Sequence, residues 1–213
     1  MTNYEKPDFW SLKAQKERYP ARSVYKLKEI DEKYNFFGFP QKSAVKILDL
    51  GAAPGSWSLY LLRRFGAGAQ GPKEFFLTSV DLQPLSEIPE FLNRKDFFFI
   101  QGDFTGEAVR EEIKSRGPYN AIISDAAPLT TGSRTVDTQR SLLLAEEVFS
   151  FTESCLAPGG KAAVKIFQGA DTNSLLKRFR ENFKTAKSFK PRSCRSNSFE
   201  TYLLGLGACR EKI

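Results

Sequence analysis

The absence of histidine from all 213 residues limits the acid–base chemistry open to this chain. No His-based triad, general base or metal ligand can form, so a base near neutral pH must be a perturbed Lys, carboxylate, Tyr or Cys. Lys165 stands out because it lies between Val164 and Ile166 in the predicted strand 161–168. Burying a lysine in an apolar strand is costly. The alternative is an edge or strand-end position from which the amine reaches water.

Four aspartates come at the ends of predicted strands. They are Asp49, Asp81, Asp103 and Asp125, at the ends of strands 45–50, 75–82, 96–103 and 119–125. The C-terminal strand ends of an open parallel sheet line one edge, where ligands bind, and four carboxylates there would repel one another without a suitable partner. A cofactor such as S-adenosylmethionine offers a sulfonium, an ammonium group, an amine and ribose hydroxyls. The alternative, that aspartate favours turns, explains one or two of these positions more readily than four.

The loop after the first predicted strand consists of small residues. Residues 45–57, V-K-I-L-D-L-G-A-A-P-G-S-W, predict a buried strand, a tight turn, and a helix over 57–65 with Ser56 as its N-cap. Such a turn lets backbone N–H groups approach a ligand closely. The loop is not G-x-G-x-x-G, which disfavours a pyrophosphate cradle for NAD or FAD. It suits an adenosine with a compact charged tail; an ordinary strand–helix turn is the alternative.

Strands and helices alternate along the rest of the chain, which predicts an α/β fold of the Rossmann-like kind. The expected strands are 45–50, 75–82, 96–103, 119–125, 161–168 and 199–206, and the expected helices are 22–35, 57–65, 107–114, 137–155 and 170–183. The A-P-G-G segment after residue 155 is a helix stop signal. Residues 66–73 form a Gly-rich loop. No repeat or linker marks a second domain, so one domain over 1–213 is expected, with 1–21 as a basic and aromatic N-terminal segment.

Composition narrows the class of protein further. Hydrophobic residues make up 41% of the chain, and no apolar run approaches the ~20 residues of a membrane span. The N-terminus lacks the apolar core of a signal peptide, so a cytoplasmic protein without membrane contact is expected. The three cysteines, Cys155, Cys194 and Cys209, form no C-x-x-C pair, which argues against a zinc site and against disulfides. No metal site is predicted.

The charge balance points to a polyanionic partner. Lys and Arg number 32 against 25 Asp and Glu, which gives a net charge of +7. Aromatics and cations alternate in residues 1–21, a mixture that can stack on bases and neutralise phosphates, and a second cationic run covers 184–195. The alternatives are a loosely packed N-terminal arm and an ordinary basic surface. Lys26 and Lys28 lie off the apolar stripe of helix 22–35, where solvated surface lysines are usual.

Five motifs in order resemble those of the FtsJ/RrmJ family of S-adenosylmethionine-dependent RNA ribose 2′-O-methyltransferases, and the similarity runs nearly from end to end. The motifs are A-R-S-V-Y-K-L-K-E-I at 21–30, D-L-G-A-A-P-G-S-W at 49–57, S-D-A-A-P at 124–128, V-K-I-F-Q-G at 164–169 and S-F-E-T-Y at 198–202. The resemblance implies a seven-stranded, mostly parallel sheet with helices on both faces and an antiparallel last strand. It also implies RNA as substrate and S-adenosylmethionine as cofactor.

The resemblance further implies which residues act. The family's catalytic Lys-Asp-Lys-Glu tetrad falls on Lys26, Asp125, Lys165 and Glu200. In this interpretation Lys165 is the general base, Asp125 orients its amine, and Glu200 holds Lys26, which steers the substrate hydroxyl. Cofactor contacts are expected from Gly55, Trp57, Asp81, Asp103 and Asp125, and from the adjacent Gly51, Ala53, Ser56, Leu82 and Phe104.

Two departures weaken assignment to one subfamily. Ala126 stands where bacterial rRNA enzymes of the family carry methionine, and Ser56 stands where glycine is common. The expected substrate is a uridine of large-subunit rRNA, and the expected state is a monomer. Alternatives are ribose methylation of tRNA or an mRNA cap, and a non-catalytic RNA-binding factor in ribosome assembly. A Rossmann dehydrogenase is disfavoured by the missing G-x-G-x-x-G.

Overall fold

The computed structural model describes residues 8–41, 43–66, 72–169 and 172–209. Its strands are β1 (Ala44–Leu50), β2 (Glu74–Asp81), β3 (Phe97–Gln101), β4 (Tyr119–Ser124), β5 (Leu156–Phe167), β6 (Phe183–Phe189) and β7 (Glu200–Ala208). Its helices are α1 (Phe9–Lys16), α2 (Val24–Tyr34), α3 (Ser56–Phe65), α4 (Glu107–Arg116), α5 (Arg134–Cys155), α6 (Thr172–Asn182) and the short 3₁₀ helix η1 (Pro89–Phe91).

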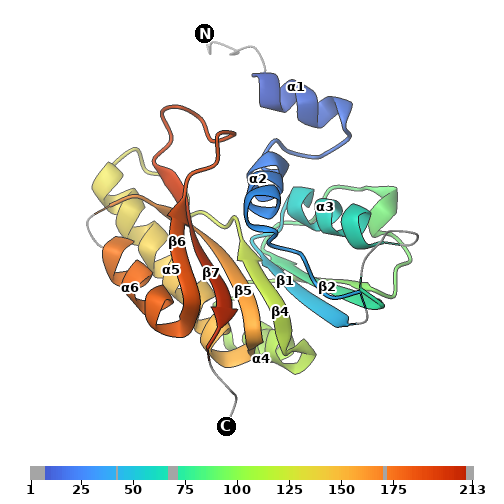
Figure 1. Cartoon of the computed structure of the whole chain (residues 1–213). Coiled ribbons are helices and arrows are strands. Elements are labelled where there is room, and N and C mark those ends of the chain that lie inside the picture. The colour runs from blue at the N-terminus through green and yellow to red at the C-terminus, as the bar shows by residue number, and fades with distance from the viewer. Residues whose placement is uncertain (1–7, 42, 67–71, 170–171, 210–213) are drawn as a thin grey trace.

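The strands form one seven-stranded sheet in the order β3-β2-β1-β4-β5-β7-β6 (Figure 1). Strands β1 to β5 pair in parallel, whereas β7 runs antiparallel to both of its neighbours, β5 and β6. The α/β fold predicted from the sequence is confirmed, with the reversed last strand. The strand order changes direction between β1 and β4, and ligands of open α/β sheets bind beside such a switch point, at the C-terminal strand ends.

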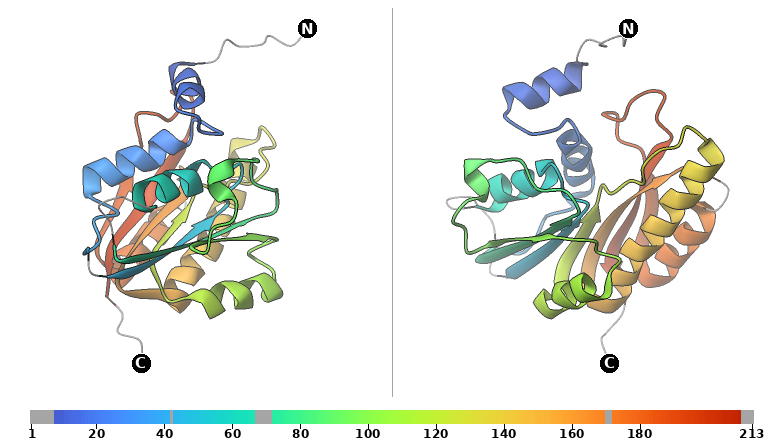
Figure 2. Two further views of the ribbon diagram at one scale, coloured as in Figure 1. Left: turned by 90° about the vertical axis from the view of Figure 1, so that its right-hand side faces the viewer. Right: turned by 180° about the vertical axis from the view of Figure 1, so that it is seen from behind.

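Helices cover both faces of the sheet (Figure 2). Alternate residues of each strand point to opposite faces, so Ile47 packs in the cluster under α2 and α3, whereas Leu48 packs in the cluster under α4, α5 and α6. The amphipathic stripes of α2 and α3 contribute side chains such as Leu27 and Leu61 to the first cluster. The two cores hold the strand ends, and therefore the loops that follow them, in a fixed arrangement.

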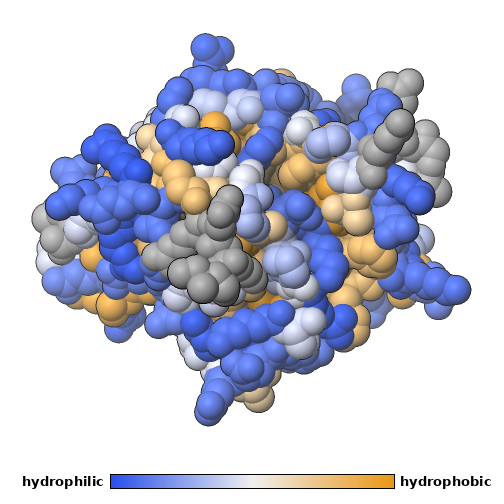
Figure 3. Space-filling model, turned by 60° about the horizontal axis from the view of Figure 1, so that its bottom comes forward, coloured by the Kyte–Doolittle hydropathy of each residue, from blue (hydrophilic) through white to orange (hydrophobic). Residues whose placement is uncertain are grey.

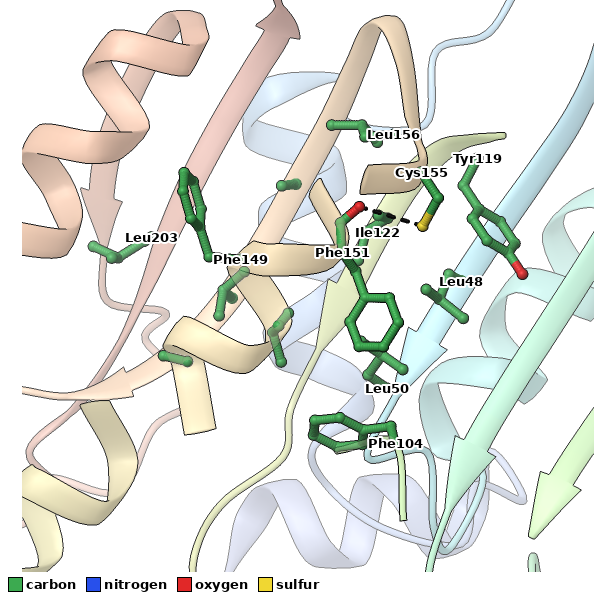
Figure 4. Close-up of a cluster of buried hydrophobic side chains, with 14 of the residues drawn as sticks. Leu48, Leu50, Phe104, Tyr119, Ile122, Phe149, Phe151, Cys155, Leu156 and Leu203 are labelled. Atoms are coloured by element: carbon green, nitrogen blue, oxygen red, sulfur yellow. Dashed lines mark hydrogen bonds between the residues drawn. The ribbon is translucent and has the colours of Figure 1, made fainter. Parts of the chain in front are cut away.

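The larger core lies between the sheet and α5 (Figure 4). Phe151 is fully buried there and meets Phe104 edge-to-face at 6.4 Å between ring centroids. The thiol of Cys155, the last residue of α5, donates to the carbonyl of Phe151 at 3.3 Å. Within the described chain none of the cysteines forms a disulfide: Cys155 and Cys194 are buried, and Cys209 is exposed. The packing fixes the course of α5, whose N-terminal end borders the site.

Three elements differ from the sequence predictions. The cationic run over 184–195 overlaps an edge strand, β6, which forms because its partner β7 supplies the pairing. Residues 9–16 form α1, and its N-cap is Asp8, whose side chain accepts a hydrogen bond from the Ser11 N–H. Gly55, with φ of +106°, takes the N-cap position predicted for Ser56, and Ser56 is the first residue of α3.

Parts of two predicted elements, and part of the basic N-terminal segment, lie outside the described residues. The expected loop 66–73 includes 67–71, and the expected helix 170–183 includes 170–171, of which α6 covers the described part. Lys6 of the N-terminal segment belongs to the residues left undescribed.

Figure 3 shows the end of the molecule opposite the C-terminal edge of the parallel strands, where hydrophilic side chains surround patches of hydrophobic ones. Exposed rings in the described chain include Phe76, at 41%, and Phe98, at 39%. No helix within the described ranges is long and apolar enough to cross a membrane.

Candidate active site

Four elements bring the predicted tetrad together at the C-terminal edge of the parallel strands. Asp125 follows β4 directly, and Lys165 lies two residues before the end of the neighbouring β5. Because β7 runs in the opposite direction, its first residue, Glu200, starts at this same edge, opposite Phe167 of β5. Lys26 reaches the group from α2, which lies beside this edge (Figure 1).

The four side chains form a closed ion-pair group. Lys26 Nζ lies 2.8 Å from Glu200 Oε2 and 3.8 Å from Asp125 Oδ1. Lys165 Nζ lies 3.2 Å from Asp125 Oδ1 and 3.8 Å from Glu200 Oε2, and it also donates to the Asp125 carbonyl at 3.1 Å. The side chains are only 10–15% exposed. Two cations and two carboxylates therefore neutralise one another at a largely buried position, which offsets the cost of removing each charge from water.

Burial and charge act against each other on two members of this group. Burial lowers the pKa of Lys26, but the carboxylates of Asp125 and Glu200 outweigh burial and raise this pKa above its ordinary value. Burial raises the pKa of Asp125, but the charges of Lys165 and Lys26 outweigh it and hold the pKa of this carboxyl below its ordinary value. Lys26 is thus a permanent cation near neutral pH, and Asp125 a permanent anion.

Tyr202 is a fifth member of the group, and the sequence analysis gave it no role. Its hydroxyl donates to Asp125 Oδ1 at 2.5 Å, and its ring packs against the Trp57 indole, with centroids 5.8 Å apart. Burial and the nearby Asp125 carboxylate raise the pKa of Tyr202 well above its ordinary value, so the phenol stays a donor. The signal was its position two residues after Glu200, which places both side chains on the same face of β7.

A cavity of about 810 Å³ opens beside the tetrad over the switch point between β1 and β4. Seven of the ten predicted cofactor residues line it: Gly51, Ala53, Asp81, Leu82, Asp103, Phe104 and Asp125. The exposed apolar side chains of Leu82, Leu129 and Leu143 are also part of its lining. An apolar rim with a few acceptors inside is the usual form of a small-molecule site.

The acceptors of this cavity suit hydroxyl and amino groups. Asp81 accepts hydrogen bonds from the N–H groups of Ala53 and Gln83, one on each oxygen, which fixes the carboxylate and leaves a lone pair on each oxygen. Asp103 is held in the same way by Thr105, through one oxygen only. The carboxylates and the apolar rim match the ribose hydroxyls, positive charges and adenine of S-adenosylmethionine.

The geometry at Gly51 explains why the loop after β1 needs a small residue. This glycine has φ of +75°, and a Cβ there would lie 2.6 Å from Cβ of Ala126. The loops after β1 and β4 therefore approach each other too closely for a side chain at this position. That close approach shapes the floor of the cavity.

The other three predicted cofactor residues do not line this cavity. Gly55 is the N-cap of α3, and a Cβ at this position would lie 2.8 Å from the Phe91 ring. The Ser56 hydroxyl bonds to the backbone N–H and carbonyl of Ala21, and the Trp57 indole N–H donates to the Ser23 carbonyl. The side chains of Ser56 and Trp57 thus join α3 to the start of α2.

Asp49 departs from the expected row of four carboxylates. Alternation along β1 directs it to the α3 face, where it is 1% exposed and accepts a hydrogen bond from the Ser58 hydroxyl at 2.7 Å. Burial raises the pKa of Asp49 to about 7, against the lowering effect of that hydrogen bond. Its partner is therefore a serine beneath the loop, and only the other three aspartates line the cavity.

A second cavity, of about 630 Å³, meets the tetrad from the other side. Lys26, Lys165 and Glu200 lie in its wall, together with residues of the loop between β6 and β7. Arg195, from the predicted cationic run over 184–195, lines this cavity. Arg178 on α6 instead forms ion pairs with acidic residues of α5. The tetrad therefore separates two cavities. No group of three or more His, Cys, Asp or Glu side chains that could hold a metal occurs in the described chain.

The sheet order, the reversed β7 and the cavity at the switch point define the class of S-adenosylmethionine-dependent methyltransferases. The same fold is seen in human methyltransferase-like protein 13 in complex with SAH, at a TM-score of 0.55 and 13% identity over 80% of this chain and 75% of that one. Residues 19–208 match the family described as FtsJ-like methyltransferase. This chain belongs to that family and is an enzyme that takes its methyl group from S-adenosylmethionine.

Relatives cover nearly the whole chain. A protein of Treponema denticola named ribosomal RNA large subunit methyltransferase E is 50% identical over 95% of this chain and 96% of its own length. A protein of Nitratidesulfovibrio vulgaris with the same name is 43% identical over 94% of both chains. The crystal structure of a Plasmodium falciparum protein described as a ribosomal RNA methyltransferase has a TM-score of 0.72, at 28% identity over 91% of this chain and 100% of that one.

Proposed function

We propose that this enzyme methylates the ribose 2′-hydroxyl of a uridine in large-subunit ribosomal RNA. The names of the full-length relatives at 50% and 43% identity support the substrate. One structural observation carries the chemistry: Lys26, Asp125, Lys165 and Glu200 lie together where two cavities meet. A cofactor on one side and a ribose on the other would each reach the tetrad.

The cavity of about 810 Å³ is the proposed cofactor site. S-adenosylmethionine, when bound, supplies a methyl group made electrophilic by a positively charged sulfur. Asp81 and Asp103 would accept hydrogen bonds from hydroxyl and amino groups of the cofactor. Leu82 and Phe104 would pack against its apolar surface, and the floor formed by Gly51 and Ala53 admits it closely.

Within the tetrad we assign the base to Lys165. Its amine would accept the proton that the 2′-hydroxyl loses as the oxygen is methylated. Lys26 is unsuited to this task, because its neighbouring carboxylates raise its pKa and keep it charged. It is suited to hold the hydroxyl oxygen and to stabilise negative charge that develops there. Asp125 and Glu200 would fix the two amines in place, and the correct positioning of hydroxyl and base would supply much of the rate.

The remaining expectations follow from this assignment. Both cavities and all four tetrad side chains come from one chain, which supports action as a monomer. All described strands belong to one sheet, which supports a single methyltransferase domain over 1–213. An rRNA substrate makes the cytoplasm the expected place of action.

A comparison of acceptors tests the substrate. Labelled methyl transfer from S-adenosylmethionine would be measured with large ribosomal subunits, free rRNA and tRNA in parallel. The proposal predicts label on one rRNA ribose in the subunit or in free rRNA. Label on tRNA alone would replace the substrate and keep the chemistry, and no label on any acceptor by a protein that binds the cofactor would contradict the proposal.

A further inference from the structure

One wall of the second cavity consists of two aromatic rings and an arginine, and neither catalysis nor cofactor binding gives these side chains a role. Phe199 and Phe167 meet edge-to-face, with ring centroids 4.8 Å apart and planes at 63°. The exposed Arg134 places its guanidinium 5.5 Å from the Phe199 centroid. All three residues line the cavity, next to Lys165. An aromatic ring that is half buried, with an arginine beside it, is a surface on which a nucleobase stacks.

Three polar side chains of the cavity lack a hydrogen-bonding or ionic partner among the residues that the structure describes. Ser193 is fully buried, yet its hydroxyl has no hydrogen-bond partner among the described residues. Arg134 and Arg195 form no salt bridge with any described residue. A buried hydroxyl without a partner is costly unless a ligand or water satisfies it, and two unpaired arginines at the rim suit phosphates.

The loop between β6 and β7, which carries Phe199, is held in place by contacts with α2 and with the residues just before this helix. Glu29 on α2 accepts hydrogen bonds from the N–H groups of Arg192 and Ser193, at 2.7 and 2.8 Å. Arg22 donates to the Ser193 carbonyl and forms an ion pair with Asp8. The loop between β6 and β7 is thus tied to α2, which also carries Lys26. The wall and the tetrad are therefore fixed relative to each other before any substrate binds.

The burial of the tetrad constrains how RNA can enter. The side chains of Lys26 and Lys165, which line the cavity, are only 11% and 10% exposed. In a continuous A-form helix the 2′-hydroxyl lies in the shallow minor groove, where the backbones around it keep it from reaching this depth. The nucleotide must leave the stack, as it does in other enzymes that act on buried positions of nucleic acids.

We infer that the second cavity binds a single unstacked nucleotide, with its base against Phe199, its ribose at Lys26 and Lys165, and its flanking phosphates at Arg134 and Arg195. This inference rests on the proposed function, because it names the subsite that an RNA ribose methyltransferase would use. It adds an element that the tetrad does not require: the enzyme selects unpaired RNA at the target position.

Fluorescence of a Phe199→Trp variant tests the stacking directly. The variant would be titrated with poly(U) and with the duplex poly(A)·poly(U), with S-adenosylhomocysteine present to fill the cofactor site. Wild-type protein gives the background from Trp10 and Trp57. Phe76→Trp is the matched control, because Phe76 is exposed at the opposite end of the sheet. We expect poly(U) to quench the Phe199→Trp variant strongly, the duplex to quench it several-fold less, and neither to quench Phe76→Trp.

A second variant measures the contribution of the ring. Phe199→Ala is expected to weaken poly(U) binding, measured by anisotropy, by about tenfold, since one stacked base contributes roughly five- to a hundredfold. Binding of S-adenosylmethionine should stay unchanged. The inference is overturned if poly(U) fails to bind at low salt, if it binds without quenching beyond the control, or if the duplex quenches equally.

These readouts need no methyl transfer, so the two failures are distinguishable. Quenching by poly(U) together with no methylation of large ribosomal subunits would contradict the proposed function and support the nucleotide subsite. Methylation of subunits without selective quenching would support the proposed function and contradict the nucleotide subsite.

Discussion

Lys26 on α2 and Lys165 on β5 share the same two carboxylates in opposite order of distance. Lys26 lies closer to Glu200, at 2.8 Å, than to Asp125, at 3.8 Å, whereas Lys165 lies closer to Asp125, at 3.2 Å, than to Glu200, at 3.8 Å. Each amine therefore has one close and one distant carboxylate. This arrangement separates two lysines that would otherwise repel each other, and it gives them different surroundings and different proposed roles.

Loss of Glu200 tests the balance of charge in this group. Glu200→Gln leaves two lysines facing one carboxylate at a position with about a tenth of each side chain exposed, so we expect a loss of stability of about 2–4 kcal/mol. Adding Lys26→Met should recover at least half of that loss, because the unpaired cation is removed. Methyl transfer should stay low in both variants. Urea unfolding measures the stabilities, and a double variant less stable than Glu200→Gln would contradict the account.

Tyr202 is predicted to position Asp125. Tyr202→Phe removes the only hydroxyl that donates to the Asp125 side chain among the described hydrogen bonds, while the ring packing against Trp57 is kept. A buried hydrogen bond to a charged group contributes about 1.5–3 kcal/mol. We expect a lower Tm, a decrease in kcat of about tenfold and an unchanged affinity for S-adenosylmethionine. An unchanged kcat in a destabilised variant would assign Tyr202 to packing alone.

Asp49 is predicted to make stability fall as pH rises from about 4 to about 7. The pKa of its carboxyl is 3.8 when unfolded and about 7 in the folded protein because of burial, so only the unfolded chain releases the proton over this window. The difference corresponds to on the order of 4 kcal/mol. Asp49→Asn has no such proton. Its stability relative to wild type should therefore rise between pH 4 and 7 and then level off, and a constant difference in urea unfolding would refute this assignment.

Cofactor affinity should depend on Asp81. Asp81→Asn places an NH₂ group against at least one of the backbone N–H donors of Ala53 and Gln83, which disturbs the cavity wall and removes a charge. We expect the Kd for S-adenosylmethionine, measured by titration calorimetry, to rise by about tenfold or more. Asp96→Asn is the control, since Asp96 lies just before β3, at the opposite end of the sheet, and pairs with Arg94 away from the cavity. Equal affinities of wild type and Asp81→Asn would remove Asp81 from the proposed cofactor site.

Much of the sheet could be predicted from the sequence because hydrophobic runs and small-residue turns are local signals. Strand β6 could not, since Lys184 and Lys187 make an edge strand look like a surface run, and only pairing with β7 gives it a regular structure. Helix α1 could not be predicted from the sequence either. Its contacts are made by few buried residues, which leaves little apolar pattern to detect.

The proposed site divides in the same way. Asp125 could be anticipated from a strand end and Lys165 from its place inside an apolar strand, but the burial of Lys26 could not. It depends on carboxylates about a hundred or more positions away in the chain. Asp49 was grouped with the other aspartates by sequence position. The period of two along β1 directs it to the opposite face, a difference that appears only once the register is known.

The most direct test of the account is methyl transfer to large ribosomal subunits by wild type and by Lys165→Ala. Labelled S-adenosylmethionine is the donor, the product is mapped by resistance of the 3′ phosphodiester to alkali, and Lys95→Ala, an exposed lysine at the other end of the sheet, is the control. The account predicts one alkali-resistant linkage with wild type and the control, and a rate at least ~100-fold lower with Lys165→Ala despite normal cofactor binding. Transfer by Lys165→Ala at the wild-type rate, or label on a base instead of a ribose, would contradict it.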